Sequence, residues 1–357
     1  MVPVPAVPVA LPVEVVPESA GLHEARPRLL LITPPNSYRT AAYLAAARRR
    51  GIEILVASEG RYSLVSELAG GLQVDLDKPS ALQDLLEANA RQAFAGVVAT
   101  DDVVVELGSR VAGALGLPHN PPSAARYSRR KDLSRRVLAD AGVPVPAHRS
   151  VRLDAPLESQ IASVVFPCVV KPVALSGSRG VIRADNASEL LEAIGRVRAI
   201  LAREYSRDSE LSTQLLVETF VPGKEVALEG MLSRGRLTVL AIFDKPDPLD
   251  GPFFEETYYI TPSRHPAAVC ERIISRVQQA CTALGLREGP VHAEVRIHDG
   301  DGVIMEVASR TIGGDCARLL QFGTGHGLED MVISHAVGDP LSARPQEGGA
   351  GVLMIPI

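Results

Sequence analysis

Cysteine, excess basic charge and long hydrophobic runs are all scarce in this sequence. The four cysteines among 357 residues, Cys168, Cys270, Cys281 and Cys316, are scattered and form no C-x-x-C pair. This spacing argues against a zinc site or a disulfide framework and fits a reducing, cytoplasmic location. The net charge of −5 gives no general attraction to nucleic acid. No apolar run is long enough to span a membrane, so we expect neither nucleic acid nor membrane as a partner.

Two common phosphate-binding motifs are also absent from the glycine-rich stretch at 166–186. It has neither the G-x-x-x-x-G-K-[ST] pattern of a Walker loop nor a G-x-G-x-x-G that follows a strand. Instead, a short apolar run ends at Lys171, and the loop after it contains Ser176, Gly177, Ser178, Arg179 and Gly180. Glycine and serine let backbone N–H groups turn toward phosphate oxygens, and the two basic residues add positive charge. The stretch predicts a phosphate-binding hairpin, with an ordinary flexible turn as the alternative.

The composition indicates a soluble globular protein of two or three domains, since 46% of the residues are hydrophobic and 22% are charged. Residues 1–27 are rich in proline, which blocks helices and sheet ladders, and predict a mobile arm. Strands then alternate with helices, an order typical of a doubly wound parallel sheet. The strands are expected at 28–33, 52–57 and 96–99, and the helices at 39–50, 83–89 and 103–115. Asn36 follows the first strand, where such sheets bind ligands, although a helix cap explains it equally well.

The pattern changes after 120–125, which looks like a connection between domains. A basic helix is expected at 128–141, and the later pattern predicts antiparallel strands with long helices at 188–203 and 266–284. The strands are expected at 165–171, 181–183, from 215, at 225–232, 236–244, 289–297, 302–307 and 351–357. An Asp-Gly-Asp-Gly turn joins two of the late strands. The loop at 247–262 could be a mobile cover over a site.

Two glutamates stand on the late strands, Glu294 on the first and Glu306 on the second. A carboxylate in an apolar strand costs free energy unless it is paired or binds a cation. Two carboxylates on neighbouring strands can point to one face and hold a hard cation such as Mg²⁺. The alternative is that both glutamates face solvent.

The order of these features resembles the ATP-grasp superfamily. Its elements are a basic helix with Lys131, the lysine–glycine hairpin, the segment V-E-T-F-V-P-G-K-E at 217–225, the two late glutamates and Arg310 behind them. H-A-E-V around Glu294 and M-E-V-A-S-R-T-I-G-G-D around Glu306 look most like the L-amino acid ligases, which are dipeptide synthases. The resemblance implies an α/β fold class, with an α+β ATP-grasp domain preceded by a doubly wound parallel α/β domain.

The resemblance also implies domain boundaries. The arm would span 1–27, the preceding domain 28–120 and the ATP-grasp domain 121–345, with the lid inside 166–224. Residues 346–357 would begin a C-terminal strand or subdomain, which relatives usually extend further. An exposed strand edge there could pair with a second copy, so a homodimer is a candidate assembly.

The resemblance also implies an ATP site beside the hairpin. Lys131 and Lys171 would hold the phosphates of ATP under a mobile lid. The lid residues would be Ser176, Gly177, Ser178 and Gly180. The nucleoside would lie against Glu218 as acceptor for the adenine amino group, the backbone of Phe220 and Val221 along the ring edge, and Glu225 at the ribose hydroxyls.

The implied reaction has two steps. A substrate carboxylate attacks the γ-phosphate of ATP to give an acyl phosphate and ADP, and an amine then attacks the acyl carbon and expels phosphate. Glu294 and Glu306 would hold one or two Mg²⁺ ions, with Mn²⁺ as an alternative, and Arg310 would stabilise the acyl phosphate. His292, two residues before Glu294, shares its strand face and would orient a carboxylate or act as a base, unless it is a core histidine. Ala308 stands where many relatives have a metal-binding asparagine.

The carboxylate and amine substrates would be small molecules, whose identity the sequence leaves open. Gly313 and Gly314 would leave room for them, and further contacts could come from 253–259 and from around Asn36 and Arg318. Two alternatives stand beside the ligase. One is another ATP-grasp chemistry, such as a purine-pathway ligase or a biotin-dependent carboxylase, and the other is a nucleotide-binding module without catalysis.

Overall fold

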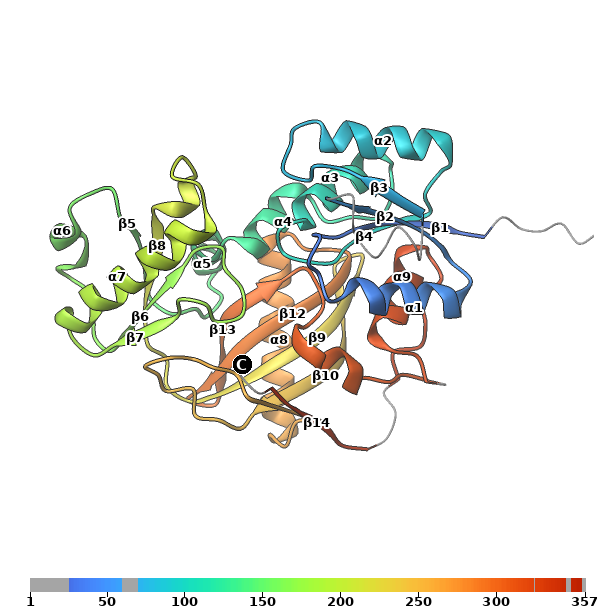
Figure 1. The fold of residues 1–357 in the computed structure, drawn as a ribbon. Helices are drawn as coiled ribbons and strands as arrows, with labels where there is room; N and C mark the ends of the chain where they lie inside the picture. Colours follow the sequence, from blue (N-terminus) through green and yellow to red (C-terminus); the bar gives the residue numbers. More distant parts are fainter. Residues whose placement is uncertain (1–25, 60–69, 324, 345–347, 355–357) are drawn as a thin grey trace, which may run out of the picture.

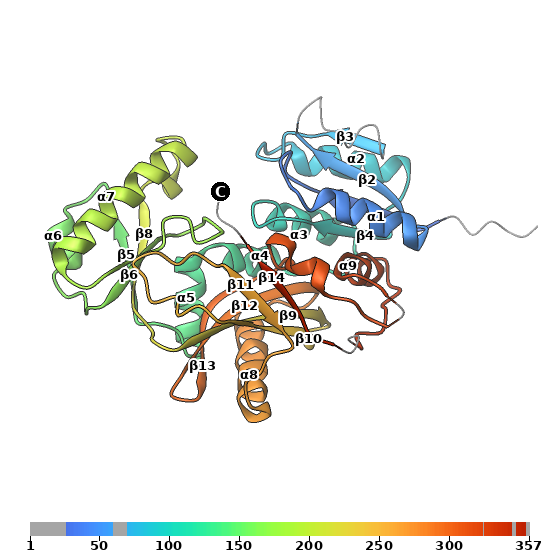
Figure 2. The same cartoon turned by 60° about the horizontal axis from the view of Figure 1, so that its bottom comes forward.

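The computed structural model describes residues 26–59, 70–323, 325–344 and 348–354, and these form three sheets (Figures 1 and 2). The expected mobile arm at 1–27 lies almost wholly outside the described residues. Within the described part of the chain, no helix is long and apolar enough to cross a membrane.

The first sheet belongs to an α/β unit and is fully parallel, in the order β3-β2-β1-β4. Its elements are β1 (Arg28–Ile32), α1 (Thr40–Arg50), β2 (Glu53–Ser58), β3 (Gly70–Gln73), α2 (Ala81–Arg91), β4 (Gly96–Ala99) and α3 (Val105–Ala114). Leu29 and Leu31 of β1 pack in one core with α1, whereas Leu30 and Ile32 pack in another with α2 and α3. Successive side chains of a strand point to opposite faces, so both faces are covered, and the doubly wound parallel sheet is confirmed.

The central sheet has six antiparallel strands in the order β13-β12-β9-β10-β11-β14. They are β9 (Lys224–Ser233), β10 (Arg236–Lys245), β11 (Tyr258–Thr261), β12 (Gly289–His298), β13 (Asp301–Ala308) and β14 (Ala350–Leu353). Val226 and Leu228 pack on α8 (Ala267–Leu284), while Ala227 between them joins the core on the other face. This second face turns toward the α/β unit and carries the candidate site.

The third sheet, order β5-β8-β6-β7, forms what we call the lid unit, residues 148–219. Its elements are β5 (His148–Arg152), α6 (Leu157–Ile161), β6 (Cys168–Pro172), β7 (Ile182–Ala184), α7 (Ala187–Glu204), a 3₁₀ turn (Glu210–Ser212) and β8 (Gln214–Thr219). Strands β6 and β7 pair antiparallel, with Cys168 opposite Ala184, which confirms the expected hairpin. Leu190, Ile194 and Val197 of α7 pack against the sheet.

The structure differs from the sequence prediction at several elements, among them β11, which lies within the loop expected at 247–262. Helix α4 (Pro122–Arg129) begins inside the connection expected at 120–125, with proline in its first turn, a position that needs no N–H donor. Arg130 is extended, so the expected basic helix is divided into α4 and α5 (Lys131–Asp140). Strands β3 and β5 were not expected; each pairs with one strand of its own unit, β2 and β8 respectively.

A shared hydrophobic core joins the α/β unit to the central sheet. It contains Tyr43 of α1, Phe243 of β10, Ile312, and Met331 of α9 (Leu328–Ala336). Figure 2 shows α9 beside α1, although α9 follows the strands of the central sheet in the sequence. Because this core fixes the α/β unit over one face of the central sheet, loops after β1 and β4 reach the same place as the late hairpin strands.

Candidate active site

A cavity of about 640 Å³ lies where the three units meet. Its walls come from the lid unit, the central sheet and the loops that follow β1 and β4. Every site residue expected from the sequence lines this cavity except Gly180, as do Gly313 and Gly314. Neither Asn36 nor Arg318 lines it, whereas Tyr38 and Arg39, close to Asn36, do.

Lys171 on β6 points at Glu218 on the neighbouring strand β8. Its Nζ lies 2.5 Å from Glu218 Oε2, and Arg135 Nε of α5 lies 2.5 Å from Oε1. Burial alone would raise the pKa of Glu218, but the charges of Arg135 and Lys171 lower it to about 2. Both oxygens of Glu218 thus face cations, which differs from the expected contact with an adenine amino group. In this arrangement Glu218 positions Lys171.

Lys131 connects the lid loop to the late hairpin. Its Nζ donates to Leu175 O at 2.8 Å and lies 3.1 Å from Glu306 Oε2. Its backbone N–H donates to Val173 O at 2.8 Å. The lysine therefore lies between the start of the glycine-rich loop and a carboxylate expected to bind metal.

The glycine-rich loop contains three residues in the left-handed region, with φ of +67° at Gly177, +52° at Ser178 and +76° at Gly180. Glycine adopts this conformation without the steric cost that other residues incur. Ser176, Gly177 and Ser178 line the cavity, and Arg179 pairs with Glu204 of α7. The loop is thus placed over the cavity, as a phosphate-covering lid requires.

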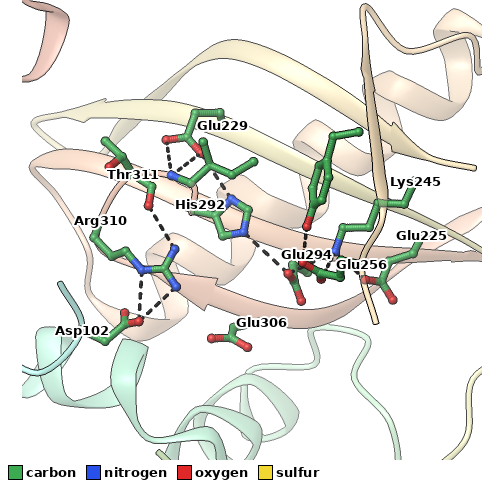
Figure 3. Close-up of polar contacts among 12 residues, drawn as sticks. Asp102, Glu225, Glu229, Lys245, Glu256, His292, Glu294, Glu306, Arg310 and Thr311 are labelled. Atoms are coloured by element: carbon green, nitrogen blue, oxygen red, sulfur yellow. Dashed lines mark hydrogen bonds and ion pairs between the residues drawn. The ribbon is translucent and has the colours of Figure 1, made fainter. Parts of the chain in front are cut away.

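An acidic cluster surrounds Lys245, at the end of β10 (Figure 3). Lys245 Nζ lies 2.8 Å from Glu225 Oε1, 2.6 Å from Glu256 Oε1 and 3.1 Å from Glu294 Oε1. The lysine is only 2% exposed. Burial opposes its charge, but the three carboxylates raise the pKa of Lys245 well above its usual value.

The carboxylates suit a hard divalent cation. Oxygens of Glu225, Glu256 and Glu294 lie within 4.8 Å of one another, and Glu306 stands directly opposite Glu294 on β13. Carboxylate oxygens are the ligands that Mg²⁺ takes in proteins, so the donor set fits. The expected metal pair, Glu294 and Glu306, is brought together by strand register, although the three converging acids include Glu225 and Glu256 rather than Glu306. Ala308 is buried and offers no oxygen.

His292 lies on β12 between two carboxylates. Its Nδ1 is 3.3 Å from Glu229 Oε2, and its Nε2 is 3.7 Å from Glu294 Oε1. Burial would lower the pKa of His292, but these two carboxylates raise it to about 9. Glu229, itself fully buried, also accepts from the backbone N–H of Ile312 at 3.1 Å. Of the roles open for His292, this geometry favours a hydrogen-bond donor over a base.

Arg310 is held by the α/β unit. Its Nε and Nη2 each lie 3.0 Å from Asp102 Oδ2, in the loop after β4, and its Nη1 donates to Thr311 O at 3.0 Å (Figure 3). Burial opposes its charge, but Asp102 and Glu306 raise the pKa of Arg310. The catalytic arginine expected from the sequence is therefore fixed in place by an ion pair between two units.

The opposite end of the cavity is aromatic. Arg296 lies over the ring of Phe220, 5.2 Å from its centroid, and donates to Val221 O at 2.8 Å and to Glu225 Oε2 at 3.0 Å. Phe220 and Phe254 pack with their centroids 6.5 Å apart. A flat apolar ring can lie against such a wall, as expected for the adenine end. Glu225, expected at the ribose, is held by Lys245 and Arg296.

Comparison with known proteins agrees with this geometry. The ATP-grasp domain family model matches residues 164–318, which cover the lid hairpin, the acidic cluster and Arg310. Residues 164–318 thus resemble an ATP-grasp domain. The crystal structure of L-amino acid ligase from Bacillus licheniformis superimposes on it with a TM-score of 0.79 and 28% sequence identity, covering 93% of this chain and 81% of that one.

Curated sequence relatives match this chain over only part of their own length. It is 31% identical over 205 residues to D-alanine–D-alanine ligase of Gloeobacter violaceus, covering 54% of this chain and 63% of the relative. It is 29% identical over 304 residues to the uncharacterized protein y4rH of Sinorhizobium fredii, covering 84% of this chain and 61% of the relative. The chain thus spans about three fifths of the length of these relatives.

Several residues of the site were not named from the sequence. Lys245 stands opposite Glu225 in the register of the β9–β10 hairpin, so counting back from its turn could have found it, apart from a one-residue irregularity at Val239. Glu229 of β9 stands opposite His292 on β12. The alternation of side chains along β9 places Glu225 and Glu229 on the same face, so Glu229 could also have been found from the sequence. Glu256 lies in an irregular loop and Asp102 in another unit, so no local pattern pointed to them.

Proposed function

We propose that this chain is an ATP-dependent ligase of the ATP-grasp type, which joins the carboxylate of an amino acid to an amine through an acyl phosphate and releases ADP and phosphate. The observation that carries the proposal is the position of Arg310, held by Asp102 beside Glu306, with Lys131 and Lys171 under the same lid. The likeness to an L-amino acid ligase and to a D-alanine–D-alanine ligase supports amino acids as substrates.

In the first step, an oxygen of the substrate carboxylate attacks the γ-phosphorus of ATP, and the bond to the β-phosphate oxygen breaks. Lys131 and Lys171 neutralise the phosphate charges, and the loop at 176–180 excludes water. Mg²⁺, held by Glu294, Glu306 and their neighbours, would shield the phosphate oxygens from the incoming carboxylate. The adenine lies toward Phe220 and the backbone near Val221, while Glu218 holds Lys171 in position.

In the second step, the amine attacks the acyl carbon and the bond to the phosphate oxygen breaks. Arg310 faces the negative charge that grows on the acyl and phosphate oxygens. His292 has a carboxylate at each nitrogen, so it is held in its protonated form and does not take the proton of the amine. The protein contributes positioning and charge, and no side chain forms a covalent bond to substrate.

The test is ADP release by the purified protein with ATP, Mg²⁺, a mixture of amino acids and hydroxylamine, which converts an acyl phosphate to a hydroxamate. We expect hydroxamate to form, and the amount of ADP to equal that of hydroxamate and peptide together. A carboxylase would need bicarbonate for ADP release, and a purine-pathway ligase would release ADP only with its own nucleotide substrate. Binding of ATP without ADP release in any mixture would favour a module without catalysis.

The proposal extends to location and assembly. A cytoplasmic location suits an enzyme that consumes ATP and has the four free cysteines of this chain. Strand β14 ends the central sheet, and Leu353 on it and Tyr258 opposite are exposed, which supports pairing with a second copy. Light scattering would give twice the chain mass for such a homodimer and the single mass if the edge is not used.

A further inference from the structure

Arg39, a buried arginine of the α/β unit, faces the cavity with part of its hydrogen-bonding capacity unused. It directly precedes α1 and is 9% exposed. Its Nη1 donates to Asp101 Oδ1 at 2.6 Å, and its guanidinium lies 4.8 Å from the ring centroid of Tyr38. Its Nε is buried and has no hydrogen-bond partner among the residues the structure describes. Such a donor costs free energy unless something else binds it.

The space in front of this guanidinium is kept open by Gly313. A Cβ at Gly313 would lie 3.4 Å from Arg39 Nη2 and 3.3 Å from Tyr38 Oη. The backbone of Gly313 is extended, with φ −82° and ψ 178°, so its conformation does not require glycine. What the missing side chain provides is room beside Arg39.

The acids near Arg39 are largely engaged elsewhere. Asp101 accepts from Ser37 Oγ and Thr100 Oγ1, each at 2.6 Å, as well as from Arg39. Asp102 pairs with Arg310. Glu329 is half-buried, and the charges of both Arg49 and Arg39 act on its carboxylate. The guanidinium is therefore oriented by Asp101 while its Nε stays free for a ligand.

We propose that Arg39 binds the carboxylate of the amino acid whose amine attacks the acyl phosphate. This inference rests on the proposed ligase function. A guanidinium holds a carboxylate through two parallel hydrogen bonds, which fixes direction as well as position. The bound amino acid would therefore present its amine in one orientation.

The position of Arg39 assigns it to the attacking substrate. Asp101, its partner, directly precedes Asp102, the partner of Arg310. Figure 3 places Asp102 and Arg310 at one end of the polar cluster and Lys245 at the other. Arg39 and Arg310 are thus held by consecutive carboxylates of one loop, and both line the same cavity, so an amino acid bound by Arg39 can present its amine to the acyl group beside Arg310. The acceptor is accordingly an amino acid and not a simple amine.

A competition experiment tests this assignment. The full chain receives ATP, Mg²⁺ and an equimolar mixture of amino acids and their carboxamides, and mass spectrometry gives the ratio of dipeptides to dipeptide amides. One charge-assisted contact predicts a ratio of roughly 10 to 100 in favour of dipeptides. Arg39→Gln should bring the ratio close to one, and Arg39→Lys, which keeps the charge opposite Asp101, should retain part of it. Because both products come from one reaction, a partly unfolded variant still reports the ratio.

The matched control is Arg50→Gln, on the same helix but paired with Asp339 at the surface, which should keep the original ratio. An unaltered ratio in Arg39→Gln, or no preference in the original protein, overturns the role of Arg39. Formation of hydroxamate in the hydroxylamine assay without any peptide product also overturns the role of Arg39, although it still supports formation of the acyl phosphate. Absence of hydroxamate and ADP instead contradicts the proposed function itself.

Discussion

Lys245 and Glu294 form an ion pair across a strand that separates them. Lys245 Nζ on β10 lies 3.1 Å from Glu294 Oε1 on β12, and β9 runs between the two strands. The ammonium group occupies the centre of the three carboxylates that suit a divalent cation. The lysine therefore occupies the charge environment that a divalent cation would share.

Replacement of this lysine should make stability depend on metal. Lys245→Met leaves Glu225, Glu256 and Glu294 buried without their cation, which should cost about 3–5 kcal/mol of unfolding free energy in EDTA. Millimolar Mg²⁺ should restore much of this loss, whereas it should hardly affect the original protein. Urea denaturation with and without Mg²⁺ measures both effects. Lys224→Met, exposed at the start of β9, is the control, and equal Mg²⁺ responses in the two variants would contradict the shared site.

The late glutamates should be needed for turnover but not for folding. Glu306→Gln and Glu294→Gln each remove a charge from the metal site, and we expect ADP release to fall by roughly 100-fold or more. Circular dichroism should show the fold intact. Because Glu306 pairs with Lys131, and Lys131 also donates to Leu175 O just before the loop at 176–180, Glu306→Gln also tests whether this ion pair positions the loop. Normal turnover in Glu306→Gln would remove it from the metal site.

Lys171 should contribute to nucleotide affinity. Lys171→Ala removes a cation expected at the ATP phosphates, so the Kd for ATP should rise roughly 10-fold or more, measured by calorimetry. Lys78→Ala, at an exposed lysine of the α/β unit, controls for a general loss of positive charge. An unchanged Kd in Lys171→Ala would place the phosphates elsewhere.

Glu218 should give the protein an acid-sensitive stability. Its pKa is about 2 in the folded state and about 4.5 when unfolded, so its contribution is present above pH 4.5 and is lost as the pH falls toward 2. Linkage gives a loss of about 2 kcal/mol between pH 5 and pH 3 from this group. Urea denaturation of Glu218→Gln should show a shallower pH dependence over that range. Parallel pH profiles for the variant and the original protein would refute the cation pairing.

The sequence could predict those site residues whose contacts are close in the chain or whose order along the chain matches a known motif. Lys171 and the 176–180 loop lie within one hairpin, and Glu294 and Glu306 face each other because a short turn fixes the register of β12 and β13. Lys245 and Glu229 depend on the register of β9 with its two neighbours, β10 and β12. Glu256, Arg39 and Asp102 depend on irregular loops and on packing between units, which no periodicity records.

The same reasoning explains the errors in the fold. Pro122 looked like part of a linker because proline breaks elements, yet proline is also favoured in the first turn of a helix, where α4 begins. The short strands β3 and β5 have little pattern of their own and form where a neighbouring strand offers hydrogen bonds. The long helices α7 and α8, with clear apolar faces, were predicted to within about a residue at each end.

The most direct measurement of the central claim is product analysis over a matrix of amino acid pairs with ATP and Mg²⁺. Mass spectrometry identifies the products, and coupled assays quantify ADP, AMP and phosphate. The ligase account predicts at least one pair that yields a dipeptide with one ADP and one phosphate for each bond, and no product from Arg310→Ala. Release of AMP and pyrophosphate, or a dipeptide from Arg310→Ala at the original rate, would contradict it.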